Sequence, residues 1–175
     1  MSYKNLTGKL ERRNIMYFAA FPVASGSLQW EVLGVDNDDL SKELNPDVTR
    51  GKNVLGESTF RHLGYEPEIS VDPWYADTDS KLYSGLKAAA IEEKYDDASI
   101  KGWFIEAAML QAGEDGTADA GKLKGTGYKR RAYIVPQSTG GDTAGLGIPF
   151  TVDPVGPMET VTVVYTISGR IVEVT

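Results

Sequence analysis

Asp36, Asp38 and Asp39 form the densest group of potential metal ligands in the sequence. Alternating carboxylates open the calcium loop of an EF-hand, which also needs an oxygen ligand at its fifth position, a glycine at its sixth and a glutamate at its twelfth. The residues at these positions are Leu40, Ser41 and Asp47. The group therefore does not form this calcium loop, which leaves at most a loose surface calcium site, and we predict no metal centre.

A glycine-rich stretch at residues 140–145 is the best candidate for a phosphate-binding loop. It lacks the Lys-Ser or Lys-Thr pair of a P-loop, and it leads into the strand pattern at residues 148–150 and not into a helix N-terminus. The sequence also lacks a G-x-S-x-G nucleophile motif, and no two carboxylates are singled out as an acid–base pair. We therefore predict no catalytic residue, no cofactor and no enzymatic activity.

The chain has no cysteine and a single histidine, His62. These counts exclude disulfide scaffolds, thiolate metal sites, cysteine nucleophiles and multi-histidine metal sites within one chain. His62 lies near the end of an expected strand, where a surface or capping role is more typical than that of a general base. The sequence contains no run of about 18 apolar residues, so we expect no membrane-spanning helix.

Lys129, Arg130 and Arg131 lie between Tyr128 and Tyr133 and form a small basic and aromatic patch. Patches of this composition bind single-stranded nucleic acids through phosphate attraction and base stacking. In a strand, however, alternate side chains point to opposite faces, which separates Arg130 from its two basic neighbours. Neutralisation of acidic residues, within or between subunits, is an equally good interpretation of this patch.

Charge is unevenly distributed along the chain, whose net formal charge of −7 comes from 18 basic and 25 acidic residues. Residues 1–30 carry +3, residues 31–119 carry −12, residues 120–131 carry +5 and residues 132–175 carry −3. An acidic middle is thus bracketed by two basic segments. The net negative charge argues against simple electrostatic attraction to nucleic acid or to an anionic membrane.

Strand patterns dominate the elements that must position these residues. Residues 159–167 alternate Val, Tyr and Ile with Thr, and a Ser-Gly-Arg turn then leads to a hairpin partner at residues 171–174. Further strands are expected at residues 29–35, 53–60, 68–75, 102–110 and 128–135. Trp103, Phe104 and Ile105 indicate a strand that is buried on both faces, whereas the Ala107-Ala108 pair that follows leaves a helix as the alternative. Pro73 places the strand at residues 68–75 at a sheet edge or ends it early.

Residues 80–93 have the pattern of an amphipathic helix. Leu82, Leu86 and Ala90 recur at helical spacing, and the Lys-Ala-Ala-Ala run within this segment has high helix propensity. The preceding Asp-Thr-Asp-Ser at residues 77–80 supplies N-cap candidates. The two glutamates at residues 92 and 93 lie unfavourably near the negative end of the helix dipole, so we expect fraying there.

Two long polar segments, residues 36–52 and residues 113–127, lack a regular pattern and are expected to be loops. Loops of this length are uncommon in a compact domain unless they bind a partner or order on assembly, and simple mobility is the alternative. The sequence has no internal repeat. We predict one domain over residues 1–175, a mainly β, antiparallel β-sandwich or β-barrel with one packed α-helix at about 80–93 and an N-terminal arm at about 1–14.

Two stretches of the sequence carry a family resemblance: residues 141–152 (GDTAGLGIPFTV), followed by Gly156, and residues 69–75 (ISVDPWY), which lead into the helix near residues 82–91. Both are similar to parts of the major tail tube proteins of long-tailed, siphovirus-like bacteriophages. The order of the elements is also similar, with an N-terminal arm, a hairpin with a long loop, a strand, a central helix and several strands. The resemblance extends from about residue 50 onward, by pattern more than by identity.

This resemblance implies a structural virion protein that forms stacked hexameric rings, with a lumen through which phage DNA passes without specific binding. It implies further copies of the chain and other phage tail proteins as partners. Synthesis in the bacterial host cytoplasm, including from a prophage, and a final location in the phage tail follow from it. The loop at residues 36–52 would join the rings, with Leu40, Leu44 and Pro46 as candidate inter-ring contacts. Acidic residues that face the lumen would repel the DNA phosphates.

A different hypothesis is a non-catalytic β-sandwich binding module for carbohydrate or protein. It would use Trp30, Trp74 and Trp103 as an exposed aromatic platform, although the apolar patterns around them favour core positions. A third, a β-rich enzyme, would need carboxylates that converge in a pocket. Rings or tubes at high protein concentration would favour the tail tube interpretation, whereas a tight soluble ligand without assembly would favour the binding module.

Overall fold

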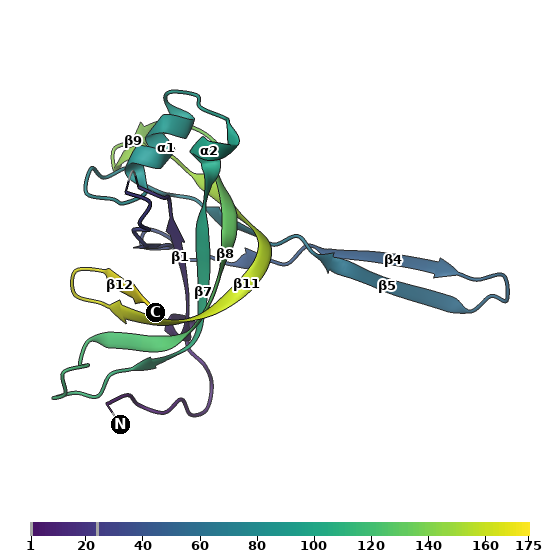
Figure 1. Cartoon of the computed structure of the whole chain (residues 1–175), viewed down its shortest axis with the longest axis horizontal. Coiled ribbons are helices and arrows are strands. Elements are labelled where there is room, and N and C mark those ends of the chain that lie inside the picture. Colours follow the sequence, from purple (N-terminus) through teal and green to yellow (C-terminus); the bar gives the residue numbers. More distant parts are fainter. Residues whose placement is uncertain (1, 24) are drawn as a thin grey trace.

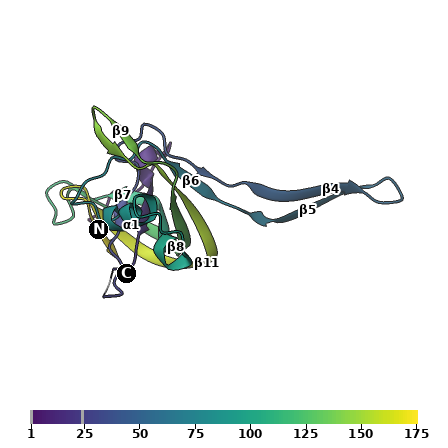
Figure 2. The same ribbon diagram turned by 90° about the horizontal axis from the view of Figure 1, so that it is seen from above.

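The computed structural model describes residues 2–23 and 25–175 (Figures 1 and 2). Strands make up 51% of the protein, which confirms the expected mainly β class with a packed helix. The strands are β1 (Ile15–Ala20), β2 (Glu31–Val32), β3 (Lys42–Glu43), β4 (Pro46–Lys52), β5 (Ser58–Tyr65), β6 (Glu68–Val71), β7 (Lys101–Ala112), β8 (Lys122–Pro136), β9 (Gly140–Asp142), β10 (Gly145–Gly147), β11 (Phe150–Thr166) and β12 (Ile171–Val174). The helical segments are a 3₁₀ turn (Arg12–Asn14), α1 (Tyr83–Ala90) and α2 (Asp97–Ile100).

The body is built on one curved antiparallel sheet with the strand order β2-β1-β7-β8-β11-β6-β3 (Figure 1). β12 also pairs with the C-terminal half of β11, which confirms the expected hairpin. The long ladder between β8 and β11 runs from Phe150 opposite Pro136 to Thr166 opposite Lys122, with a bulge between Val155 and Glu159. The curvature of the sheet brings β12 into contact with β2.

Both faces of the central strands are buried because each face supports its own hydrophobic core. In β1, Tyr17 and Ala19 belong to the first core, whereas Phe18 and Ala20 belong to the second. A strand buried on both faces reads as a continuous apolar run without alternation. This confirms the expectation for the strand around Trp103, because β7 contributes residues to both cores.

The first core lies between the sheet and α1. Leu82 and Leu86 are fully buried there together with Phe150. Gly85 allows the helix to approach the ring of Phe21, because a Cβ atom at residue 85 would come within 2.5 Å of a ring carbon. The apolar stripe predicted from the sequence therefore faces the sheet as expected.

α1 is shorter at both ends than the helix expected at residues 80–93. The segment just before α1 is held by β2, because the carboxylate of Glu31 accepts bonds from the Ser80 hydroxyl (2.7 Å), the Lys81 N–H (2.7 Å) and the Leu82 N–H (3.4 Å). The predicted N-cap candidates at residues 77–80 are not the cap, because the N-cap residue is Leu82 and it has no side-chain cap bond; the Ser80 hydroxyl oxygen accepts from the Leu82 N–H (3.2 Å). Beyond the helix, Glu93 has a left-handed φ of +51°, which prevents helical continuation.

The prediction of an irregular loop at residues 36–52 is wrong for its second half. β3 pairs with β6, and β4 pairs with β5 from Pro46 opposite Tyr65 to Lys52 opposite Ser58. The strand expected at residues 53–60 is correspondingly a turn followed by β5. Every residue of β4 is exposed, so this strand has no buried face whose hydrophobic alternation the sequence pattern could reveal.

Three other boundaries differ from the expectations. The strand expected at residues 29–35 is reduced to the two residues of β2, and β6 ends at Val71, before Pro73, as the proline predicted. The loop expected at residues 113–127 ends at Gly121, because β8 begins at Lys122 and pairs with β7 and β11 through the last two glycines of this stretch, Gly125 and Gly127. These differences arise because backbone pairing with long neighbouring strands extends or ends a strand independently of its local composition.

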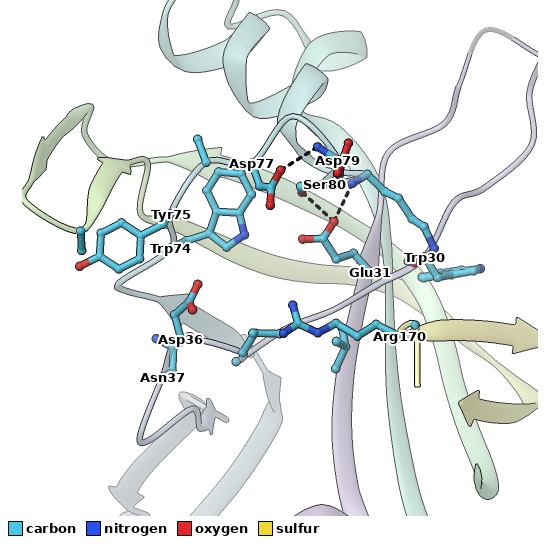
Figure 3. Close-up of a pocket in the computed structure, with 17 residues that line it drawn as sticks. Trp30, Glu31, Asp36, Asn37, Trp74, Tyr75, Asp77, Asp79, Ser80 and Arg170 are labelled. Carbon is cyan, nitrogen blue, oxygen red and sulfur yellow. Dashed lines mark hydrogen bonds between the residues drawn. The ribbon is translucent and has the colours of Figure 1, made fainter. Parts of the chain in front are cut away.

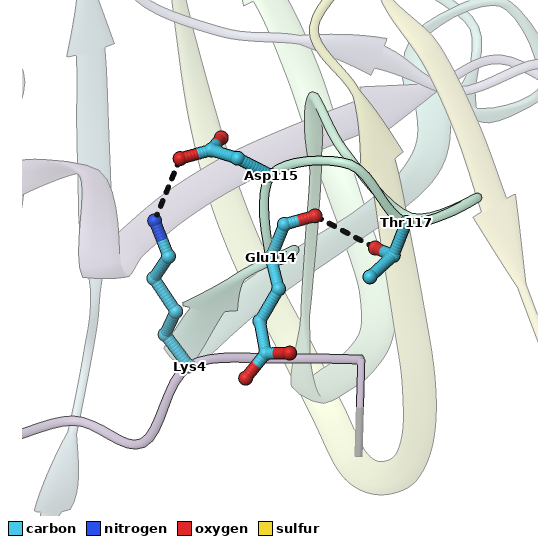
Figure 4. A network of polar contacts seen from close by, with 4 residues as sticks. All are labelled: Lys4, Glu114, Asp115 and Thr117. Atoms are coloured by element: carbon cyan, nitrogen blue, oxygen red, sulfur yellow. Dashed lines mark hydrogen bonds and ion pairs between the residues drawn. The ribbon is translucent and has the colours of Figure 1, made fainter.

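The N-terminal arm expected at residues 1–14 is anchored at its start, with Met1 outside the described residues. Tyr3 forms a β-bridge with Gly113, and the Lys4 N–H donates to the carbonyl of Ala112 (2.8 Å). Figure 4 shows the Lys4–Asp115 ion pair (3.2 Å) at this attachment. Both side chains of that pair are well exposed, so the backbone bonds contribute more than the ion pair to holding the arm.

Candidate functional site

β4 and β5 form an arm, defined here as residues 46–65, that projects from the body as a separate two-stranded sheet (Figures 1 and 2). Its residues are exposed throughout, with Gly64 half-buried. An isolated two-stranded hairpin is at best marginally stable in water, because it has no hydrophobic face to bury. The arm thus combines regular backbone pairing with an absence of packing partners among the described residues.

Large apolar side chains line this arm and have no cover. Their exposed fractions are 39% for Val48, 102% for Val54, 78% for Leu55, 61% for Phe60, 67% for Leu63 and 57% for Tyr65. Exposed apolar surface gathered on one element is typical of an interaction site.

One face of the arm is partly organised by its own aromatic contacts. Val48 lies opposite His62 and Arg50 lies opposite Phe60, so all four share this face. The guanidinium carbon of Arg50 is 5.8 Å from the centroid of the Phe60 ring, and His62 packs edge-on against Tyr65 with the ring centroids 4.5 Å apart. His62 is therefore a surface residue, in agreement with the interpretation from sequence.

The tip of the arm, residues 53–57, is held in one conformation by Asn53. The side-chain oxygen of Asn53 accepts from the N–H groups of Leu55 (3.0 Å) and Glu57 (2.9 Å), and its amide nitrogen donates to the Glu57 carboxylate (2.5 Å). Gly56 adopts a φ of +77°, which closes the turn at no cost from a side chain. This network leaves Val54 and Leu55 pointing away from the arm.

The three candidate inter-ring residues from the sequence fall in two different environments. Leu40 belongs to the first core, with 6% of its surface exposed, so the expectation that it offers a contact surface is wrong. It was misjudged because the surrounding residues 36–39 are polar, whereas the chain at this point folds back over the sheet. Leu44 (47% exposed) and Pro46, the first residue of β4, lie near the base of the arm.

Sequence reasoning missed the apolar residues in the outer part of the arm. The available signal was local: Val54 and Leu55 occupy the centre of an Asn-to-Gly turn, where polar residues are usual. Two adjacent large aliphatic residues at a turn expose apolar surface that the turn itself cannot bury.

A cavity of about 530 Å³ lies on the body between β2, the segment before α1 and the turn that joins β11 to β12 (Figure 3). Trp30, Val32 and Trp74 supply apolar parts of its wall. The charged side chains that line it are Glu31, Asp36, Asp77, Asp79, Lys81 and Arg170, which makes its wall acidic on balance.

The polar groups of this cavity are unevenly satisfied. Glu31 is engaged by the start of α1, and one carboxylate oxygen of Asp77 accepts from the Asp79 N–H (2.9 Å). The side-chain amide nitrogen of Asn37, in contrast, is buried without an acceptor among the described residues. At the rim, the negative charge of Asp142, whose carboxylate accepts from the Tyr75 hydroxyl (3.4 Å), raises the pKa of Tyr75.

The basic and aromatic patch on β8 is divided as the strand alternation predicts. Lys129 and Arg131 lie over the ring of Trp103, at 4.9 Å and 4.4 Å from its centroid, and Lys129 also pairs with Glu159 (3.5 Å). Arg130 points to the opposite face, where burial lowers the pKa of its guanidinium. Lys129 is therefore paired with a carboxylate of the same chain, whereas Arg131 is engaged by an aromatic ring.

The exposed aromatic platform of the alternative hypothesis is not formed by the three tryptophans. Trp30 and Trp74 are buried, with 7% and 8% of their surfaces exposed, and Trp74 packs edge-on against Phe150. Within residues 2–23 and 25–175, no group of three or more acidic or histidine side chains is arranged to hold a metal ion. Over the same residues, no helix has the length and apolar character needed to cross a membrane.

A functional assignment for this chain rests on its geometry. The sequence matches no protein-family model, and no curated protein is significantly similar to it.

Proposed function

We propose that this protein is a self-assembling structural subunit of a bacteriophage tail tube, in which copies join into rings and the rings stack. The projecting arm is the observation that carries the proposal. A body with two packed cores does not need a bare two-stranded extension for its own stability, and the arm's uncovered apolar side chains are those that assembly would bury.

Sheet edges also support assembly. The arm presents the outer edges of both β4 and β5, and an unpaired strand edge readily pairs with another chain unless something covers it. A closed symmetric ring or a stack of rings removes such edges from solvent. Hexameric stoichiometry and passage of DNA through the lumen are parts of this proposal that rest on the resemblance to tail tube proteins.

Electron microscopy of the purified protein over a series of increasing concentrations tests this function. We expect rings or tubes with a central lumen, whose abundance rises with concentration because assembly is a mass-action process. A particle that remains monomeric at every concentration, in sedimentation as well as in micrographs, would contradict the proposal. A tight soluble ligand found for that monomer would instead support the binding-module hypothesis.

A further inference from the structure

The cavity beside β2 has the features of a socket for another protein segment. Its volume of about 530 Å³ falls within the range of roughly 300–1,000 Å³ that ligand pockets occupy. Its wall combines indole and aliphatic surface with several carboxylates (Figure 3). An occupant that fits it should therefore bring aliphatic side chains together with positive charge.

The tip of the arm matches these requirements. Val54 and Leu55 supply two adjacent aliphatic side chains on a turn that Asn53 holds in one conformation. Residues 48–63 include three basic side chains, Arg50, Lys52 and Arg61, against the single acidic side chain of Glu57. The tip itself, residues 53–57, carries the single charge of Glu57, so the positive charge that faces the acidic cavity comes from Arg50 and Lys52, which flank the tip. Because the tip is already ordered, docking loses little conformational entropy.

We propose that this cavity receives the arm tip, residues 53–57, of a second copy of the chain. The tip of the same copy cannot enter it, because the arm points away from the body while β12, at the end of the turn that bounds the cavity, lies on the other side (Figures 1 and 2). The contact thus joins two different surfaces, head to tail. Repetition of such a contact produces a closed ring or an open stack.

This inference rests on the proposed self-assembly and specifies the surface that accepts the arm. Because the chain lacks cysteine, disulfide trapping has no background from native thiols. One preparation carries Val54→Cys at the tip, and a second carries Val35→Cys at the rim of the cavity, where Val35 is 47% exposed. The control partner for the tip variant is Met158→Cys on β11, which is similarly exposed at 56% and does not line the cavity.

Mixing the tip variant with each partner under mild oxidation gives the decisive comparison. We expect the Val54→Cys and Val35→Cys pair to form a mixed disulfide at least about tenfold faster than the control pair, because docking raises the local concentration of the two thiols. Leu55→Asp added to the tip variant should remove this advantage. All substituted positions are exposed, so circular dichroism is expected to show an unchanged fold.

The outcomes separate this inference from the proposed function. Rings or tubes that form while the cavity pair reacts no faster than the control pair would overturn the socket and leave the structural role standing. Rapid trapping of the cavity pair in a protein that never forms rings or tubes would support the socket and contradict the tail tube role. An absence of both assembly and selective trapping would contradict both.

Discussion

At the scale of single residues, Glu31 connects β2 to the segment that leads into α1. It lies on β2, and its carboxylate satisfies N–H groups at the start of α1, about fifty residues further along the chain. A negative charge at this position also interacts favourably with the positive end of the helix dipole. One side chain therefore anchors the segment that leads into α1 to β2.

Glu31→Ala is expected to lower the free energy of unfolding by about 1–2 kcal/mol, which corresponds to a fall of roughly 3–6 °C in Tm for a domain of this size. Glu31→Gln retains an acceptor oxygen without the charge and should lose clearly less. Thermal unfolding followed by circular dichroism measures both. Equal losses for the two variants would show that the capping hydrogen bonds contribute nothing beyond the charge.

Asp153 gives stability a dependence on pH. Burial, and secondarily the charge of Glu68, raise the pKa of Asp153, so the folded state binds this proton more tightly than the unfolded state. Its ionised form is therefore unfavourable in the folded protein. This penalty is present above the raised pKa and disappears as the pH falls below the ordinary aspartate value of about 3.9.

Asp153→Asn should consequently raise Tm at pH 7, and this gain should vanish as the pH approaches 3. Asp47→Asn, on the exposed arm, is the matched control, for which we expect no comparable gain. Differential scanning calorimetry over this pH range measures the difference. A gain that persists unchanged at pH 3 would contradict the assigned cause.

At the scale of elements, the arm is separable from the body. At its base the Glu66 N–H donates to the carbonyl of Asn45 (3.2 Å), and β3 and β6 continue the same antiparallel pairing below it. Residues 45 and 66 are thus already placed as the ends of a tight hairpin. The two cores lie entirely in the body.

Replacement of residues 46–65 by an Asn-Gly turn should therefore leave the body folded, with Tm changed by only a few degrees at most. Assembly, measured by sedimentation velocity and electron microscopy, should be lost. A body that unfolds would show that the arm contributes to folding, whereas normal assembly without the arm would contradict its proposed role.

At the scale of the whole molecule, the net charge of −7 disfavours attraction of DNA phosphates, and the Lys129 and Arg131 side chains of the basic patch are engaged with Trp103. A conduit for DNA requires that the phosphates find no strong attraction along its wall. Weak interaction with DNA is therefore a property that the proposed role demands.

We expect no retardation of double- or single-stranded DNA in gels at about 0.15 M salt, an ionic strength at which long-range attraction is largely screened. The same protein with Glu57→Lys and Glu159→Lys provides a matched, more basic control. Tight retention of DNA by the native chain under these conditions would contradict a passive lumen.

Local pattern determined a large part of the fold. The apolar stripe of α1, the two-sided burial of β7 and the hairpin of β11 with β12 follow from side-chain periodicity within each segment. These elements bury side chains of their own, so the hydrophobic effect leaves a readable spacing. The mainly β class and the helix follow from the sequence for this reason.

Only the tertiary structure decided the arm, the cavity and the attachment of the segment before α1 to β2. β4 is exposed along its whole length, so nothing in its own spacing marks it as a strand, and its partner supplies the backbone bonds that make it one. Leu40 is buried although its neighbours are polar. Glu31 and Ser80, and the walls of the cavity, meet through long-range contacts that no local periodicity encodes.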